Sequence, residues 1–148
     1  MTGWTAFAHG LATELAAAPD TTVLVIGESA APGARRFAQF RKTGTAVAAE
    51  LTGDEWLEPA FRPDADGIRA ITEAGWQTPD EAHMDNWWAE FPWPTTTEDY
   101  QRLAAMTVTG LRDGFGIAAP TTLVYRGWVE QAGNSDLHLP GLGIPDAP

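Results

Sequence analysis

The sequence predicts a single α+β domain, in which an antiparallel β-meander packs under an N-terminal and a C-terminal helix. Apolar residues recur at helical spacing near the start of the chain and again around residue 100. Between these two patterns lie short β-prone runs separated by turn residues. With 148 residues the chain has the length of one domain. The expected order of elements is α-β-β-β-α-α-β.

The first helix is predicted over about residues 3–17, where Pro19 and Asp20 follow its last turn. Its apolar residues are three or four positions apart and therefore share one face: Trp4, Phe7, Leu11 and Leu15. This helix is expected to supply one layer of the core.

Three strands are predicted to follow the first helix. Val23–Ile26 is a short β-branched run with both faces apolar. Residues 35–42 and 45–51 flank a Thr43-Gly44 turn, which is typical of a β-hairpin. Three consecutive strands after a helix indicate an antiparallel meander with one face under that helix.

Two more helices and a strand are predicted in the second half. A short helix around Ile71 ends at Gly75, which suits a left-handed C-terminal cap. The residues from Thr95 to Glu98 form a capping-box pattern that begins a longer helix, reaching about residue 112. Residues 121–129 alternate weakly as a last strand. The domain is therefore assigned to residues 1–130, and residues 131–148 are expected to form an extended or frayed tail.

The connection between the second and third helices is rich in tryptophan. It holds four of the seven tryptophans of the chain, at positions 76, 87, 88 and 93. Each such ring buries roughly 150–250 Å² when it covers a surface. Either all four rings pack into the core, or at least one of them lines a groove for a partner. Trp87 and Trp88 are expected to point to opposite sides, because neighbouring residues of an extended segment alternate between its two faces.

The composition excludes several classes of function. The net charge is −11 and the pI about 4.4, which argues against nucleic acid or an anionic membrane as a partner. The sequence has no cysteine, so disulfides and thiol chemistry are excluded. No stretch approaches the ~20 apolar residues of a membrane span, and we see no signal-peptide pattern. The cytoplasm is the expected location.

No motif predicts catalysis, and we expect a non-enzyme without cofactor or metal. A phosphate-binding loop and a nucleophile elbow are both missing. Glu81, His83 and Asp85 could together hold a divalent ion, but a surface loop of acidic residues is the simpler interpretation. Glu50 and Asp54 are likewise interpreted as structural rather than as an acid–base pair.

One predicted strand carries four of the nine basic residues of the chain: Arg35, Arg36, Arg41 and Lys42. In an acidic protein such a strand is a local positive stripe. It is interpreted either as an edge strand protected against aggregation or as a site for an acidic peptide.

The order of several short motifs resembles the TY-Chap domains, which are related to YbjN and to the type III secretion chaperone-like fold. The first half of the resemblance is carried by Trp4-x-x-Phe7 with Leu11 and Leu15, by Ala38-Gln39-Phe40, and by Ala49-Glu50-Leu51 with Leu57. The second half is carried by Gly75-Trp76-x-x-Pro79, Asn86-Trp87, and the run from Leu111 to Ile117 with Pro120 and Leu123. The resemblance covers residues 4 to about 125 and implies protein binding rather than catalysis.

The favoured hypothesis is a non-enzymatic, chaperone-like adaptor that binds a partner protein through the aromatic loop and a sheet face, and that forms a homodimer. The homodimer is expected because one helix layer covers only one of the two apolar faces of Val23–Ile26. The candidate partner-binding residues are Trp76, Trp88, Trp93, Phe37, Arg35 and Arg41. Two alternatives remain: a small acidic immunity-type protein that neutralises a basic toxin, and a small-ligand-binding module that uses the tryptophans.

Overall fold

The structure, a computed structural model, describes residues 3–29 and 36–147. Within these ranges it contains three α-helices: α1 (Trp4–Ala17), α2 (Ala65–Ala74) and α3 (Thr97–Val108). The strands are β1 (Thr22–Glu28), β2 (Phe37–Lys42), β3 (Ala46–Leu51), β4 (Trp87–Pro92), β5 (Leu123–Val129) and β6 (Ser135–Asp136). The predicted α+β class is confirmed.

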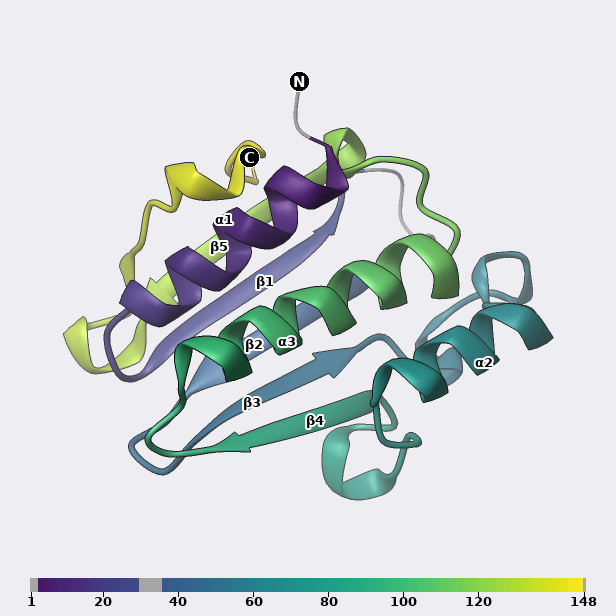
Figure 1. Cartoon of the computed structure of the whole chain (residues 1–148), viewed down its shortest axis with the longest axis horizontal. Helices are drawn as coiled ribbons and strands as arrows, with labels where there is room; N and C mark the ends of the chain where they lie inside the picture. Colours follow the sequence, from purple (N-terminus) through teal and green to yellow (C-terminus); the bar gives the residue numbers. More distant parts are fainter. Residues whose placement is uncertain (1–2, 30–35, 148) are drawn as a thin grey trace.

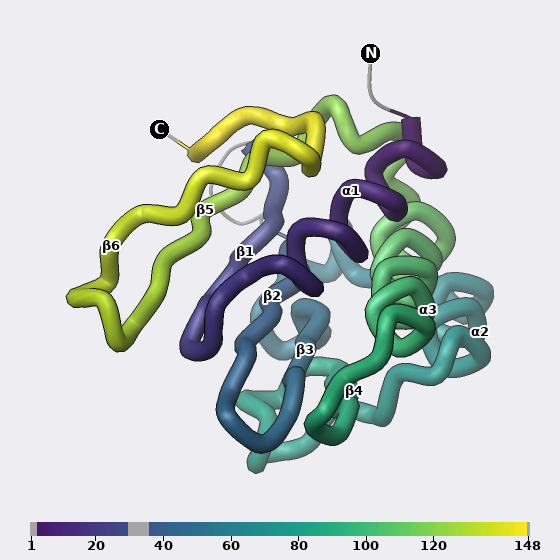
Figure 2. Tube along the Cα trace, turned by 60° about the vertical axis from the view of Figure 1, so that its left-hand side comes forward, coloured from purple at the N-terminus to yellow at the C-terminus, as the bar shows by residue number. Residues whose placement is uncertain are grey.

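The strands form one antiparallel sheet in the order β4-β3-β2-β1-β5-β6. The predicted meander is present as β1, β2 and β3. The last long strand, β5, returns to pair with β1 on its other side. Helices α1 and α3 lie side by side on one face of the sheet, and α2 lies next to α3 (Figures 1 and 2).

The aromatic connection is not only a loop, which corrects the predicted element order. Residues Trp87–Pro92 form β4, an edge strand that pairs with β3 from Leu51↔Trp87 to Ala46↔Pro92. Trp87, Ala89 and Phe91 are buried on one side, so the segment has the two-residue period of a strand. Pro92 lacks an N–H donor and fits at the end of an edge strand.

The helix ends follow the predicted local signals. Gly75 ends α2 in the left-handed conformation at φ 116°, where an L side chain would be strained. The Thr96 hydroxyl accepts a hydrogen bond from the Asp99 N–H, and the Asp99 carboxylate accepts one from the Thr96 N–H. This reciprocal pair is a capping box that begins α3.

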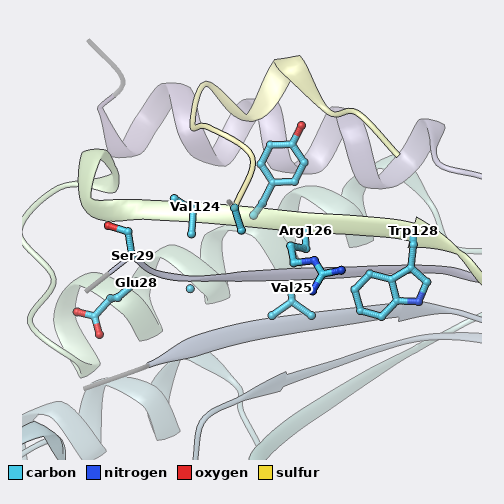
Figure 3. A pocket seen from close by; sticks show the side chains of 9 residues that line it. Val25, Glu28, Ser29, Val124, Arg126 and Trp128 are labelled. Carbon is cyan, nitrogen blue, oxygen red and sulfur yellow. The ribbon is translucent and has the colours of Figure 1, made fainter. Parts of the chain in front are cut away.

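The two faces of the sheet have different environments, because α1 and α3 cover only one of them. On the opposite face, named here the outer face, the described part of the chain places no α-helix (Figures 1 and 3). By strand register the outer face consists of Val23, Val25 and Gly27 of β1, Phe37, Gln39 and Arg41 of β2, Ala46, Ala48 and Glu50 of β3, Trp88, Glu90 and Pro92 of β4, and Val124, Arg126 and Trp128 of β5. Most of these side chains are only partly buried.

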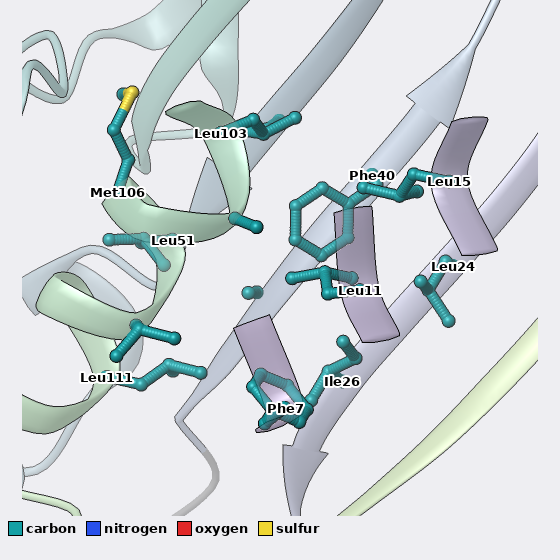
Figure 4. Packing of buried hydrophobic residues seen from close by; sticks show 14 of the residues in the cluster. Phe7, Leu11, Leu15, Leu24, Ile26, Phe40, Leu51, Leu103, Met106 and Leu111 are labelled. Atoms are coloured by element: carbon teal, nitrogen blue, oxygen red, sulfur yellow. The ribbon is translucent and has the colours of Figure 1, made fainter. Parts of the chain in front are cut away.

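The core lies between the covered face and the helices (Figure 4). Phe7, Leu11 and Leu15 of α1 are fully buried, as the helical spacing predicts. They share one cluster with these sheet and α3 residues: Leu24, Ile26, Phe40, Leu51, Leu103 and Leu111. Each of these side chains contributes about 1.5–3 kcal/mol to folding by leaving water.

The C-terminal segment docks onto the domain, so the expectation of a frayed tail is wrong. Leu139, Leu142 and Ile144 are buried and belong to the core cluster. The Leu139 N–H donates to the Tyr125 hydroxyl at 2.8 Å, and the Ala147 N–H donates to the Tyr125 carbonyl at 2.7 Å. The tail thus covers the outer edge of β5, which would otherwise present unpaired backbone groups.

Candidate functional site

The outer face contains a shallow hollow between β1 and β5, with a volume of about 360 Å³ (Figure 3). Its lining residues come from both strands and from the docked tail: Val25, Gly27, Glu28, Ser29, Val124, Tyr125, Arg126, Trp128 and Ala147. Figure 3 shows Arg126 next to Val25 in the middle of the hollow, with Trp128 at one end and Glu28 and Ser29 at the other.

This surface exists because β1 and β5 are apolar on both faces. Leu24 and Ile26 point into the core, whereas Val23 and Val25 point to the outer face. Val23 is fully buried there, since Arg41 and Trp128 lie opposite it on the two neighbouring strands. Val25 lies opposite Gln39 and Arg126 and remains partly exposed, as does Val124. Apolar surface in this position is available to a partner.

Arg36, Arg41 and Arg126 differ in what they contact, and only Arg41 and Arg126 belong to the outer face. Arg36 forms an ion pair with Glu28 at 2.6 Å, and Arg41 forms one with Glu130 at 2.7 Å. Arg126 lies over the ring of Trp128, with its guanidinium carbon 5.9 Å from the ring centroid. Within the described residues Arg126 has no carboxylate within ion-pair distance. Its charge is therefore free to meet an anionic group of a ligand.

At the β4 end of the outer face, Trp88 is held in place by a short loop. The His83 ring stacks on Trp88, with centroids 3.9 Å apart and planes inclined by 5°. Asp80 accepts hydrogen bonds from Trp88 Nε1 at 3.1 Å and from His83, whose Nδ1 lies 2.7 Å away. The hydrogen bond with His83 is the main reason that the pKa of Asp80 is lowered. Trp88 is thus a positioned, partly exposed aromatic surface.

A second contact ties the same loop to β3. The Asn86 side chain accepts from the Gly53 N–H at 2.8 Å and donates to Glu50 Oε1 at 2.9 Å. Asn86 is buried, so its bond with the Gly53 N–H is protected from water, whereas its bond to Glu50 is partly buried. They fix the Glu50 carboxylate on the outer face beside Trp88.

The structure brings only some of the predicted site residues together. Phe37, Arg41 and Trp88 lie on the outer face. Trp76 is a core residue, 2% exposed, and its Nε1 donates to the Met106 carbonyl at 3.0 Å, so it is not available to a partner. Trp93 is 51% exposed, but it follows β4 at the end of the sheet where its N–H donates to Thr45. Arg35 lies outside the described residues.

The expected positive stripe does not form among the described residues. Arg41 points to the outer face, whereas the next residue, Lys42, points to the covered face and is buried. Successive residues of a strand alternate between faces, which separates the two charges. Arg36 and Arg41 are in addition neutralised by glutamates. This strand is also not an edge, because β1 and β3 flank it.

Four residues of the outer face were missed from the sequence: Val25, Val124, Arg126 and Trp128. The alternation of residues 123–129 contained the signal, because Val124 and Trp128 make the second side of that strand apolar as well. The possible metal ligands Glu81, His83 and Asp85 do not converge, and His83 instead contacts Asp80 and Trp88. Nowhere in residues 3–29 and 36–147 do three or more His, Asp or Glu side chains form a metal-binding group.

A sheet with helices on one face and an open, partly apolar other face defines this chain as a small helix-backed sheet domain. The sequence profile of the family described as "T3SS (YopN, CesT) and YbjN peptide-binding chaperone 3" (TY-Chap3) matches residues 1–129. The chain belongs to this family of peptide-binding chaperone-type domains, which confirms the resemblance. No curated protein and no solved structure gives a significant match. Within the described ranges, no helix combines the length and apolar character needed to cross a bilayer.

Proposed function

We propose that this protein is a non-enzymatic, chaperone-like adaptor that binds an extended, partly apolar segment of a partner protein on its outer face. The observation that carries this proposal is the open sheet face with its hollow between Val25, Val124 and Trp128. Membership in a family described as peptide-binding supports the kind of ligand. The cysteine-free sequence fits action in the cytoplasm.

The chemistry of the face suits a polypeptide segment better than a compact small molecule. Partly exposed apolar groups lie on four of the five long strands: Val124 on β5, Val25 on β1, Phe37 on β2 and Trp88 on β4. The hollow is shallow and lies on an uncovered sheet face. A segment that crosses the strands would place one apolar side chain in the hollow and lay its neighbours over Phe37 and Trp88. Large aromatic residues are the groups most enriched at such binding centres.

The proposal keeps the homodimer but moves its contact from the uncovered sheet face, on which the expectation was based, to the helix side, so that the outer face stays free. A groove of about 590 Å³ runs between α1 and α3. Its lining is dominated by small side chains, among them Ala8, Ala12, Ala16 and Ala105. Such a surface allows a helix of a second copy to approach closely.

The test measures peptide binding to matched tryptophan variants. Fluorescein-labelled decapeptides, each with a single Phe among Ser and Thr residues, are screened for binding to the full chain by anisotropy. Trp128→Ala is expected to weaken the best binder at least tenfold, because it removes one wall of the hollow. Trp88→Ala is expected to weaken it less, and Trp93→Ala serves as the control that leaves binding unchanged.

Circular dichroism and urea denaturation establish that each variant is folded. Trp128 and Trp88 are partly exposed, so their replacement is expected to keep the fold. Loss of binding in Trp93→Ala together with normal binding in Trp128→Ala would place the site at the other end of the sheet and refute the proposal.

Salt separates this proposal from the immunity-type alternative. Binding that rests on apolar contact changes little between 50 and 500 mM salt, whereas charge-steered binding of a basic toxin by a −11 protein weakens steeply. A steep loss of affinity for the selected peptides would favour the alternative.

A further inference from the structure

We infer that the outer face selects a segment with an acidic residue, an apolar residue and a basic residue at alternate positions, acid-x-apolar-x-base in either direction. Arg126 of β5 receives the acidic side chain, and Glu50 of β3 receives the basic one. This inference rests on the proposed function and specifies the chemistry of the bound segment.

Strand register places Arg126 and Glu50 in one row across the sheet. Arg126 lies opposite Val25, Val25 opposite Gln39, and Gln39 opposite Glu50. Trp88 then follows Glu50 at the end of the row. Three strand spacings of about 4.8 Å separate β5 from β3, so the two charged residues are about 14 Å apart.

Both ends of this row carry charge that the protein itself leaves unneutralised. Within the described residues, Arg126 contacts the Trp128 ring and forms no ion pair, although Glu28, Glu130 and Asp136 line the same hollows. No basic side chain lies within ion-pair distance of Glu50. The only hydrogen bond that Glu50 accepts from a described side chain comes from the neutral Asn86 amide. The residues between them, Val25 and Gln39, are uncharged. The row is therefore positive at one end and negative at the other.

The distance between Arg126 and Glu50 determines how far apart the two charged residues of the ligand must be. An extended chain advances about 3.3 Å per residue, so about four residues span 14 Å. Residues i, i+2 and i+4 of an extended segment point to the same side, here toward the sheet. The middle residue of the three then lies about midway between Val25 and Gln39, beside the hollow, where an apolar side chain can contact Val25. A helix would need about nine residues for the same distance.

The test compares labelled, terminally blocked dodecapeptides with a central Phe among Ser and Thr residues. One carries Glu and Lys four residues apart on either side of Phe, others carry them three, five or nine apart, and one carries two Lys residues at the four-residue spacing. The four-residue Glu/Lys peptide is expected to bind wild type about three- to fivefold more tightly than the others, the size expected for partly exposed ion pairs.

Two charge variants test the named residues. Arg126→Glu is expected to reverse the ranking, so that the peptide with two Lys residues binds best. Glu50→Gln keeps an acceptor for the Asn86 amide but removes the charge, and is expected to abolish the spacing preference. Arg69→Glu makes the same charge change as Arg126→Glu on the exposed surface of α2 and is expected to keep the wild-type ranking.

The outcomes separate this inference from the proposed function. If wild type binds all peptides equally and Trp128→Ala no longer binds them, the charge pairing is overturned and the proposed function stands. Binding that is insensitive to Trp128→Ala would overturn the function itself. A preference for the nine-residue spacing would overturn the extended conformation in favour of a helix, and a wild-type preference for two Lys residues would show that net charge alone selects the ligand.

Discussion

At the scale of the residue, two neighbouring cations of β2 have opposite roles. Arg41 is exposed and pairs with Glu130, whereas Lys42 is 4% exposed. Lys42 Nζ donates to the carbonyls of Leu15 at 2.8 Å and Ala18 at 2.7 Å, at the end of α1. These carbonyls lack helical partners and carry the negative end of the helix dipole. The buried lysine is thus a C-terminal cap supplied by a distant strand.

Replacing each of the two cations by methionine is expected to give different losses of stability. Lys42→Met leaves two carbonyls without a charged donor and is expected to lower the free energy of unfolding by about 2–3 kcal/mol. Arg41→Met removes an exposed ion pair and is expected to cost less than about 1 kcal/mol. Urea denaturation measures both values, and equal losses would contradict the capping role.

The contribution of Asp80, in the loop under Trp88, to folding stability depends on pH. The pKa of Asp80 is lowered below 3.8, chiefly by the hydrogen bond with His83, so folding favours the charged carboxylate. A group whose folded pKa is depressed stabilises the protein above its unfolded pKa and loses this effect as pH falls through the folded pKa. The contribution of Asp80 is therefore present at pH 5 and lost progressively below pH 4.

The prediction is tested by comparing wild type with Asp80→Asn between pH 6 and pH 3. Wild type is expected to have the higher urea midpoint near neutral pH, and the difference should shrink as the pH falls below 4. Comparison with the variant cancels the titration of the other carboxylates. A constant difference over the whole range would show that Asp80 does not act through its charge.

At the scale of the element, α1 and the tail are fitted to each other through glycine. Gly10 faces Gly141, and a methyl group at position 10 would collide with the Gly141 carbonyl. The tail then continues to Leu142, which is fully buried. Close contact between helix and tail therefore requires that position 10 has no side chain.

Gly10→Ala is expected to destabilise the protein, although alanine in a helix is normally favoured by about 0.5–1 kcal/mol. The methyl group must displace the tail, which exposes Leu139 and Leu142 to thermolysin. Thr5→Ala, at an exposed position of α1 outside the groove, is the control that leaves stability unchanged or slightly raised. A higher melting temperature in Gly10→Ala, with the tail still protected, would show that the contact is not needed.

At the scale of the whole molecule, the two surfaces have separate predicted tasks. The groove between α1 and α3 is lined mainly by small residues, and the outer face carries the hollow and the free charges. Placing the second copy on the helix side leaves the outer face open for a segment of a partner.

Ala16→Glu is expected to convert the dimer into a monomer, because it adds a charge in the groove without touching the core. Thr5→Glu, an exposed position of α1 outside the groove, serves as the control with the same charge change. Light scattering at about 100 μM measures the molar mass. A wild-type monomer at this concentration would refute the dimer, and a dimer that dissociates when peptide binds would place its contact on the outer face.

The sequence by itself determined α1, the β1–β3 meander, the glycine cap of α2 and the capping box of α3. Each of these depends on residues within about ten positions, such as the spacing from Phe7 to Leu15 or the step from Thr96 to Asp99. The sequence also carried the motifs from which the family was recognised. For the site it supplied Phe37, Arg41 and Trp88, because aromatic and basic residues stand out in an acidic chain.

Only the tertiary structure decided how the remaining surfaces are covered. The sequence of the tail has no periodic pattern. Nevertheless, the Leu139 N–H donates a hydrogen bond to the Tyr125 hydroxyl, and the Gly141 carbonyl lies against Gly10. Arg41 and Arg126 cannot be distinguished by residue type. In the described structure, however, Arg41 forms an ion pair with Glu130, whereas Arg126 forms none. Val25 becomes a site residue because no described helix covers it and Arg126, about a hundred positions away, lies opposite. Burial and charge pairing are set by contacts between residues far apart in the chain, which no local period encodes.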